Sequence, residues 1–174
     1  AQIDMFGVGE RMITAKSEPV FGGVYKLTAV ENEQGEIIPK IKCSENVEKI
    51  TIPHFKKVYR LYNKDNGKAI ADYMTVYDEV VDENEPMMLF DPYATWKTKN
   101  VCNYQARELL VPVFLKGKKV YESPALKDIQ TYCKQQVDTL WDEIKRFDNP
   151  QTYYVDLSQK LWDIQQELLR KNRN

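Results

Sequence analysis

The spacing of apolar residues changes near residue 123, and this change limits what the chain can fold into. Before it, apolar and polar residues alternate over short runs such as residues 23–31, which is typical of half-buried strands. After it, apolar residues recur at steps of three or four, which is typical of an amphipathic helix. The first helical stripe consists of Leu126, Ile129, Cys133, Val137, Leu140, Ile144 and Phe147. We therefore expect the α+β fold class, with a mostly antiparallel β-rich domain followed by two C-terminal amphipathic helices.

Short apolar or alternating runs bounded by turn residues predict the strands. They cover residues 3–6, 11–15, 23–31, 37–42, 57–62, 68–81, 87–90 and 109–114. The strongest hairpin signal is Asp65-Asn66-Gly67, because Asn-Gly readily takes the positive φ angles of a type I′ turn. We therefore expect residues 57–62 and 68–81 to be joined by a tight hairpin.

Capping residues mark the limits of the two helices. Ser123 is the expected N-cap of the first helix, with Pro124 at the first helical position. Asn149-Pro150 is expected to end that helix. A second helix is predicted from Asp156 or Ser158 onward. Its stripe consists of Leu157, Leu161, Ile164 and Leu168. We expect both stripes to pack onto each other or onto the sheet.

Composition and charge exclude several classes of protein. The chain has 174 residues, 43 % of them hydrophobic and 29 % charged, which is typical of a soluble globular protein. A net charge of −1 gives no case for nucleic-acid binding. Neither a membrane span nor a signal peptide is expected. Because Cys43, Cys102 and Cys133 are far apart and odd in number, we expect no disulfide framework, no zinc site and a cytoplasmic location.

Gly7-Val8-Gly9 is the local motif with a phosphate-binding mechanism. Glycines directly after a strand let backbone N–H groups approach a phosphate without a Cβ in the way. A simple bend is the alternative interpretation of the same three residues. His54, the single histidine, lies in a loop, and no spacing indicates a carboxylate partner for acid–base work. The residues alone indicate no catalytic group and no metal site.

The N-terminal residues have a further implication. The sequence begins almost directly with Ile3-Asp4-Met5-Phe6, a pattern typical of a strand, and has no initiator methionine. Domains seldom begin in mid-strand, so we expect the chain to be part of a longer protein.

Several segments along almost the whole chain resemble, in the same order, the nicotinate phosphoribosyltransferase family. They are Ile3-Asp4-Met5-Phe6-Gly7-Val8-Gly9, Phe21-Gly22-Gly23-Val24-Tyr25-Lys26-Leu27, Lys42-Cys43-Ser44-Glu45-Asn46, Lys49-Ile50-Thr51-Ile52-Pro53, Lys57-Val58-Tyr59-Arg60, Tyr121-Glu122-Ser123-Pro124 and Tyr154-Val155-Asp156-Leu157-Ser158. Each motif is modest, but their order and spacing together are specific.

The resemblance implies a reaction and a fold. The family joins nicotinate to phosphoribosyl pyrophosphate, giving nicotinate mononucleotide and pyrophosphate with ATP hydrolysis, as an entry step to NAD. Its fold is an irregular α/β barrel fused to a β-rich domain. Residues 1–16 would then be the end of the barrel, 17–115 the β-rich domain and 116–174 a helical extension. Gly7, Val8 and Gly9 would hold the 5′-phosphate of substrate or product.

Departures from the family pattern limit which residue roles the resemblance implies for this chain. Glu10 stands where many members have Thr, and a carboxylate would repel a phosphate, so we assign it no ligand role. His54 stands where Gly is usual. The upstream barrel, with the nicotinate-stacking aromatic, the phosphoribosyl-binding arginines and the phospho-accepting histidine, has no counterpart in these residues.

We therefore expect the C-terminal portion of a larger α/β-barrel enzyme, inactive alone. Its partners would be the rest of that enzyme and small-molecule substrates, with ATP and Mg used by the whole enzyme and no cofactor held by this portion. A homodimer is left open. The alternative is a free-standing, non-catalytic binding or structural domain derived from the same module.

Overall fold

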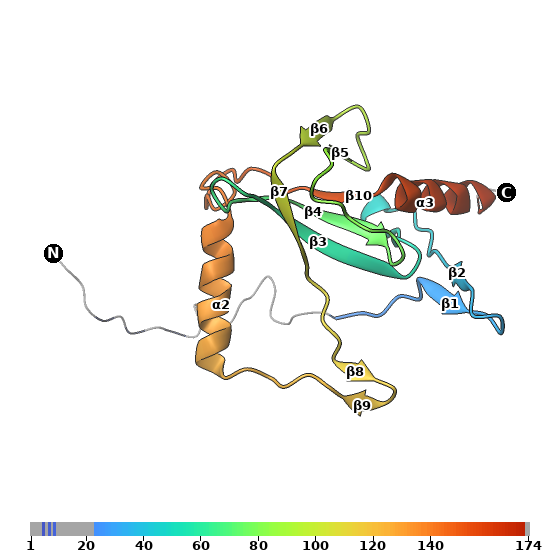
Figure 1. Ribbon diagram of the computed structural model, residues 1–174, viewed down its shortest axis with the longest axis horizontal. Helices are drawn as coiled ribbons and strands as arrows, with labels where there is room; N and C mark the ends of the chain where they lie inside the picture. The colour runs from blue at the N-terminus through green and yellow to red at the C-terminus, as the bar shows by residue number, and fades with distance from the viewer. Residues whose placement is uncertain (1–4, 6, 8, 10–22, 173–174) are drawn as a thin grey trace.

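A four-stranded sheet forms the centre of the computed structural model, which describes Met5, Gly7, Gly9 and residues 23–172 (Figure 1). Its strands are β3 (Lys56–Asn63), β4 (Ala69–Val76), β7 (Tyr104–Glu108) and β10 (Val155–Leu157). The strand order is β10-β4-β3-β7. β3 pairs antiparallel with β4 and with β7, whereas β10 pairs parallel with β4. The expected α+β fold with mostly antiparallel pairing is confirmed.

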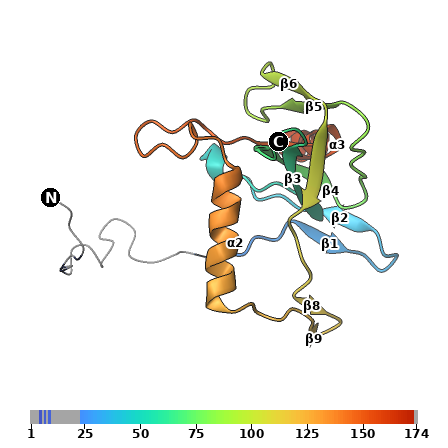
Figure 2. The same ribbon diagram turned by 60° about the vertical axis from the view of Figure 1, so that its left-hand side comes forward.

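Three short hairpins surround this sheet. They are β1 (Ala29–Glu31) with β2 (Ile37–Pro39), β5 (Met87–Phe90) with β6 (Thr98–Val101), and β8 (Phe114–Leu115) with β9 (Lys118–Lys119). A 3-10 turn, η1 (Val47–Lys49), precedes β3. The β5–β6 hairpin lies over the sheet, whereas β8–β9 lies away from it (Figures 1 and 2).

The two helices, α2 (Leu126–Thr139) and α3 (Gln159–Lys171), lie apart, at opposite ends of the sheet (Figures 1 and 2). α3 packs against β4. The middle and the C-terminal end of α2 are tied to the sheet: Arg107 Nη2 of β7 donates to the Tyr132 hydroxyl at 3.3 Å, and the Tyr62 hydroxyl of β3 donates to Gln136 at 3.0 Å. Lys68, in the turn between β3 and β4, donates from Nζ to the Asp138 carbonyl at 2.9 Å. The rest of α2 projects away from the sheet (Figure 2).

Two apolar clusters form the described core. The first lies between the sheet and the β5–β6 hairpin, around Leu61, Leu89 and Tyr104, each at most 2 % exposed. The second joins the sheet to α3, and its buried members are Val76, Leu157 and Leu161. Full burial of one leucine contributes about 1.5–3 kcal/mol, so the second cluster is sufficient to fix α3 on the sheet.

The predicted hairpin between β3 and β4 is confirmed, but its predicted turn type is wrong. Gly67 has a φ of +65°, whereas Asn66 does not have the positive φ that a type I′ turn requires. The turn is longer, because Asn63 Oδ1 accepts from the backbone N–H groups of Asp65 and Asn66 at 2.8 and 3.2 Å. The backbone N–H of Gly67 donates to the carbonyl of Asn63 at 2.8 Å.

Some predicted strands are corrected by the structure. Residues 109–113 form no strand, and the strand in this region is β7, five residues earlier. β7 was missed because it alternates Tyr104 and Ala106 with charged and amide residues, so little apolar signal remains. The strand expected over 23–31 shortens to β1. The strands expected over 3–6 and 11–15 lie outside the described residues, apart from Met5.

The first predicted helix is corrected at both ends. Its N-cap is Ala125 rather than Ser123, no side chain caps it, and Pro124 precedes the helix. It ends at Thr139, well before Asn149-Pro150, because the backbone leaves the helical region at Leu140. No residue of α2 is buried, so its stripe does not pack within the described residues as expected.

The second predicted helix is confirmed. Ser158 is its N-cap, and the Ser158 hydroxyl accepts from the backbone N–H of Leu161 at 3.2 Å. Leu161 and Ile164 of the stripe pack in the second cluster. Asp156 and Leu157 precede the helix in β10. The domain limits 1–16, 17–115 and 116–174 stay predictions.

Candidate functional site

The predicted phosphate loop is only partly described. Gly7 and Gly9 are exposed, and Val8 lies outside the described residues. No described atom lies within 4 Å of the position that a Cβ would take at either glycine. The described residues therefore bring no phosphate partner to this loop, and its role stays a prediction. Glu10 also lies outside the described residues.

His54 lies in the bend before β3 with a φ of 80°, a conformation that glycine adopts without steric cost. Its Nδ1 lies 3.2 Å from the carbonyl oxygen of Phe55, and its ring stacks 6.3 Å from the ring of Tyr77. No carboxylate hydrogen-bonds this imidazole among the described residues. The geometry fits a structural loop residue at a position that suits glycine, as the family pattern has it.

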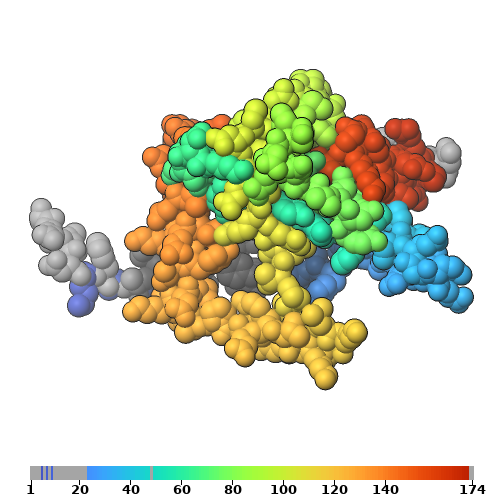
Figure 3. Space-filling model, viewed as in Figure 1, coloured from blue at the N-terminus to red at the C-terminus, as the bar shows by residue number. Residues whose placement is uncertain are grey.

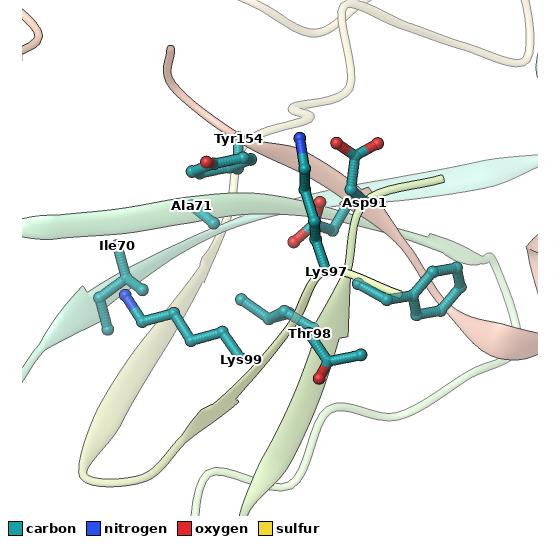
Figure 4. A pocket seen from close by; sticks show the side chains of 10 residues that line it. Ile70, Ala71, Asp91, Lys97, Thr98, Lys99 and Tyr154 are labelled. Atoms are coloured by element: carbon teal, nitrogen blue, oxygen red, sulfur yellow. The ribbon is translucent and has the colours of Figure 1, made fainter. Parts of the chain in front are cut away.

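A cavity of about 160 Å³ opens between the sheet and the β5–β6 hairpin (Figure 4). Its apolar wall is formed by Ile70 and Ala71 of β4 with Leu89 and Phe90 of β5. Polar groups come from β6, from its preceding loop and from β10 with the residues before it. They are Asp91, Lys97, Thr98, Lys99, Tyr154 and Asp156.

Asp156 is the buried acid of this cavity. It lies in β10 beside Tyr73 of β4 and is 4 % exposed. No described residue donates a hydrogen bond to its carboxylate, and its Oδ1 is fully buried without a partner. Burial, and then the charge of Asp91, raise its pKa from 3.8 to about 6. The β10 alternation causes this placement, because Val155 and Leu157 point to the opposite face.

Asp91 is held in place by its own backbone turn. Its Oδ1 accepts from the backbone N–H groups of Tyr93 and Ala94 at 2.8 and 3.1 Å. Figure 4 shows Asp91 and Lys97 towards one end of the cavity, and Ile70 and Lys99 towards the other. Both lysines are exposed, and neither makes an ion pair within the described part of the chain.

A second polar cluster lies on the other face of the sheet. Arg60 Nε and Nη2 donate to the two oxygens of Asp72 at 2.8 and 2.9 Å, and the Tyr153 hydroxyl donates to Asp72 Oδ1 at 2.9 Å. The Arg60 guanidinium also lies 5.7 Å from the centre of the Tyr153 ring. The hydrogen bond to Asp72 raises the pKa of Arg60, and burial raises that of Tyr153. Because these groups satisfy one another, the cluster is structural.

The family model of the nicotinate phosphoribosyltransferase C-terminal domain matches residues 55–165, more than half of the chain. The chain belongs to this family. The matched residues run from the start of β3 into α3, and so include the central sheet, the cavity and the polar cluster. They exclude the Gly7-Val8-Gly9 loop.

Relatives with the name nicotinate phosphoribosyltransferase match nearly the whole chain. The Bacillus subtilis protein is 43 % identical over 93 % of this chain and 33 % of its own length. The Caenorhabditis elegans protein is 33 % identical over 98 % of this chain and 30 % of its own length. The chain therefore spans about a third of the length of these relatives.

A solved structure shares the fold of this C-terminal domain. It is the crystal structure of human nicotinic acid phosphoribosyltransferase, with a TM-score of 0.62 and 23 % sequence identity. The likeness covers 68 % of this chain and 24 % of that one.

The structure brings together residues that sequence analysis did not connect. Asp91 and Asp156 are 65 positions apart and line the same cavity because β10 adds to the edge of the sheet next to β4. The sequence signal for this site is the acid within the apolar Val155-Asp156-Leu157 run, but the same residues also fit the start of a helix. Among the described residues, no cluster of three metal-ligating side chains occurs, and neither helix is long and apolar enough to cross a membrane.

Proposed function

We propose that this chain serves as the C-terminal domain of a nicotinate phosphoribosyltransferase. The whole enzyme would form nicotinate mononucleotide and pyrophosphate from nicotinate and phosphoribosyl pyrophosphate, with ATP hydrolysis, in the cytoplasm. The family match over residues 55–165 carries the proposal. Because the chain spans about a third of its relatives, the other two thirds would supply the barrel, the catalytic groups and the sites for ATP and Mg.

Exposed apolar side chains on α2 support a partner domain. Leu126, Ile129 and Val137 lie on the helix stripe and are 71, 47 and 45 % exposed. Phe114 and Leu115 of β8 are 64 and 55 % exposed. Figure 3 shows α2 in orange and the β8–β9 region in yellow standing out from the central part of the molecule. Exposed apolar surface of this extent is typical of an interaction surface.

The Gly7-Val8-Gly9 loop is proposed as one edge of the phosphate site in the whole enzyme. Backbone N–H groups of Gly7 and Gly9 would donate to the 5′-phosphate of phosphoribosyl pyrophosphate or nicotinate mononucleotide. The remaining phosphate partners would come from the neighbouring barrel strands. The bend interpretation assigns the glycines to backbone geometry alone.

The substitution Gly9→Val in the whole enzyme separates these interpretations. A Cβ at this position would displace the phosphate or forbid a positive φ. Losing one charge-assisted hydrogen bond costs about 1.5–3 kcal/mol, so we expect both ligands to bind roughly 10- to 100-fold more weakly. Ligand titration measures the affinity, and thermal unfolding of the same samples reports stability. Unchanged affinity in folded but destabilised Gly9→Val protein would contradict the phosphate role.

The purified 174-residue chain is expected to form no nicotinate mononucleotide. Catalysis needs groups positioned around the reacting atoms, and the described residues offer none for this reaction. The measurement is product formation that depends on both nicotinate and phosphoribosyl pyrophosphate. Activity of the chain alone would show that it is not one domain of a divided active site. A free-standing binding domain would also be inactive, so that alternative is tested separately by a chimera with a relative.

A further inference from the structure

The cavity lined by Asp91 and Asp156 plays no part in the function proposed above. It lies between β4, β5, β6 and β10, wholly within the folded part of this chain (Figure 4). Asp156 is 96 % buried, lines the cavity and receives no hydrogen bond from the described residues. A buried polar group without a partner destabilises a fold, and more so when it is charged, so the fold retains an unfavourable group at this point.

We propose that this cavity binds a small organic cation, a primary ammonium group carried on an apolar body of about one ring. The ammonium lies between the carboxylates of Asp91 and Asp156, and the ring lies against Ile70, Leu89 and Phe90. The binding is non-covalent. It is a site additional to any site for the substrates of the transferase.

The size of the cavity limits its occupant. A cavity of about 150 Å³ lined by apolar side chains holds a benzene ring. The cavity here has a volume of about 160 Å³, and apolar side chains form one wall. A single ring with one polar substituent therefore fits this space.

The two carboxylates of the cavity favour a cation. Asp91 acts on Asp156 as a like charge, which is unfavourable unless a positive group lies between them. Oδ1 of Asp91 is already used by two backbone N–H groups, which fixes the carboxylate and leaves Oδ2 for a ligand. An ammonium group has three donors, enough to reach both carboxylates.

Two alternatives for the same space are less favourable. Lys97 and Lys99 also line the cavity and would attract an anion, but the two carboxylates would repel it. A divalent metal ion would be held here by two carboxylates and otherwise by water, because no group of three metal-ligating side chains occurs among the described residues. Both lysines are exposed, so their ammonium groups can remain hydrated.

The test is a titration of the full chain with benzylamine, followed by NMR of labelled methyl groups. Benzyl alcohol and benzoate are the comparison ligands, because they match its size but are neutral and anionic. We expect saturable shifts centred on Ile70, Ala71 and Leu89. We also expect benzylamine to bind at least about tenfold more tightly than either comparison ligand, because only its ammonium group makes charge-assisted hydrogen bonds to the two carboxylates.

Variants identify the carboxylates. Asp156→Asn keeps the shape and removes the buried charge, and Asp91→Asn keeps the acceptor for its backbone turn. Each is expected to weaken benzylamine binding about tenfold or more. Asp148→Asn is the matched control, since Asp148 is exposed and lies outside the cavity, and it should leave binding unchanged.

Three results would overturn the proposal. They are the absence of saturable shifts at millimolar benzylamine, equal affinity of wild type and Asp156→Asn, and binding of benzoate that matches or exceeds that of benzylamine. Methyl spectra of each variant without ligand show that it is folded, and Asp91→Asn keeps the proposal testable if Asp156→Asn does not fold.

Discussion

Asp156 and Asp72 show two ways in which a strand of the same sheet accommodates a carboxylate. Asp72 is paired with Arg60 and Tyr153, so its charge is compensated. Asp156 lies on the opposite face in β10, where burial raises its pKa to about 6 and no described group compensates it. These two acids therefore have opposite effects on the stability of the fold near neutral pH.

Asp156→Asn is expected to stabilise the protein near neutral pH but much less in acid. The pKa of Asp156 is about 6 in the folded state and 3.8 in the unfolded state, so the folded state binds this proton more tightly. Protonation of Asp156 therefore stabilises the folded wild type fully below pH 3.8, and this stabilisation is lost as pH rises through about 6. The loss amounts to about 3 kcal/mol.

Urea unfolding near pH 4 and near pH 7 measures this difference. The stability gain of Asp156→Asn over wild type should grow between these two conditions, while Asp148→Asn should show no such growth. A gain that does not change with pH would mean that Asp156 is not a buried, uncompensated acid.

Asp72→Ala is expected to destabilise the fold by about 2–3 kcal/mol. The substitution removes two charge-assisted hydrogen bonds from Arg60 and leaves the Tyr153 hydroxyl without its acceptor. The pair is largely shielded, with side-chain exposures of 21 and 13 %. Denaturant unfolding gives the free energy, with Asp148→Ala as the exposed control. A decrease in the free energy of unfolding equal to that of the control would show that the cluster contributes little to stability, as is usual for a surface ion pair.

At the scale of elements, sequence patterns predicted those parts that combine strong periodicity with local contacts. The β3–β4 hairpin, β5 and α3 follow from alternation, turn residues and the Ser158 cap. The sequence does not predict β7 and β10, because charged and polar residues interrupt their apolar pattern and pairing with distant strands stabilises them. The cavity could not be predicted, since its two acids line the same space only through the β10–β4 pairing.

The two helices should respond differently to the same substitution. Leu161→Ala in α3 removes a side chain that is 0 % exposed, and we expect a loss of about 2–5 kcal/mol. Leu126→Ala in α2 removes one that is 71 % exposed, and we expect a change within about 0.5 kcal/mol. Thermal unfolding of both variants of this chain makes the comparison. Similar losses would mean that α2 packs by its stripe after all.

At the scale of the whole molecule, one end is well packed and the other is not. The sheet, the β5–β6 hairpin and α3 share two apolar clusters. α2 and β8–β9 extend from them with exposed apolar side chains (Figures 1 and 3). Exposed apolar side chains at one end of a domain are typical of a surface that contacts another part of a larger protein. It agrees with a chain that spans about a third of its relatives.

A chimera tests most directly whether this chain is a working domain of the enzyme. The matched C-terminal third of the Bacillus subtilis nicotinate phosphoribosyltransferase, 43 % identical to this chain, is replaced by it. We measure nicotinate mononucleotide formed from nicotinate and phosphoribosyl pyrophosphate. The domain hypothesis predicts kcat/KM within about tenfold of the parent, equivalent to about 1.4 kcal/mol of transition-state stabilisation. A chimera that folds with the stability of the parent but forms no product would contradict it.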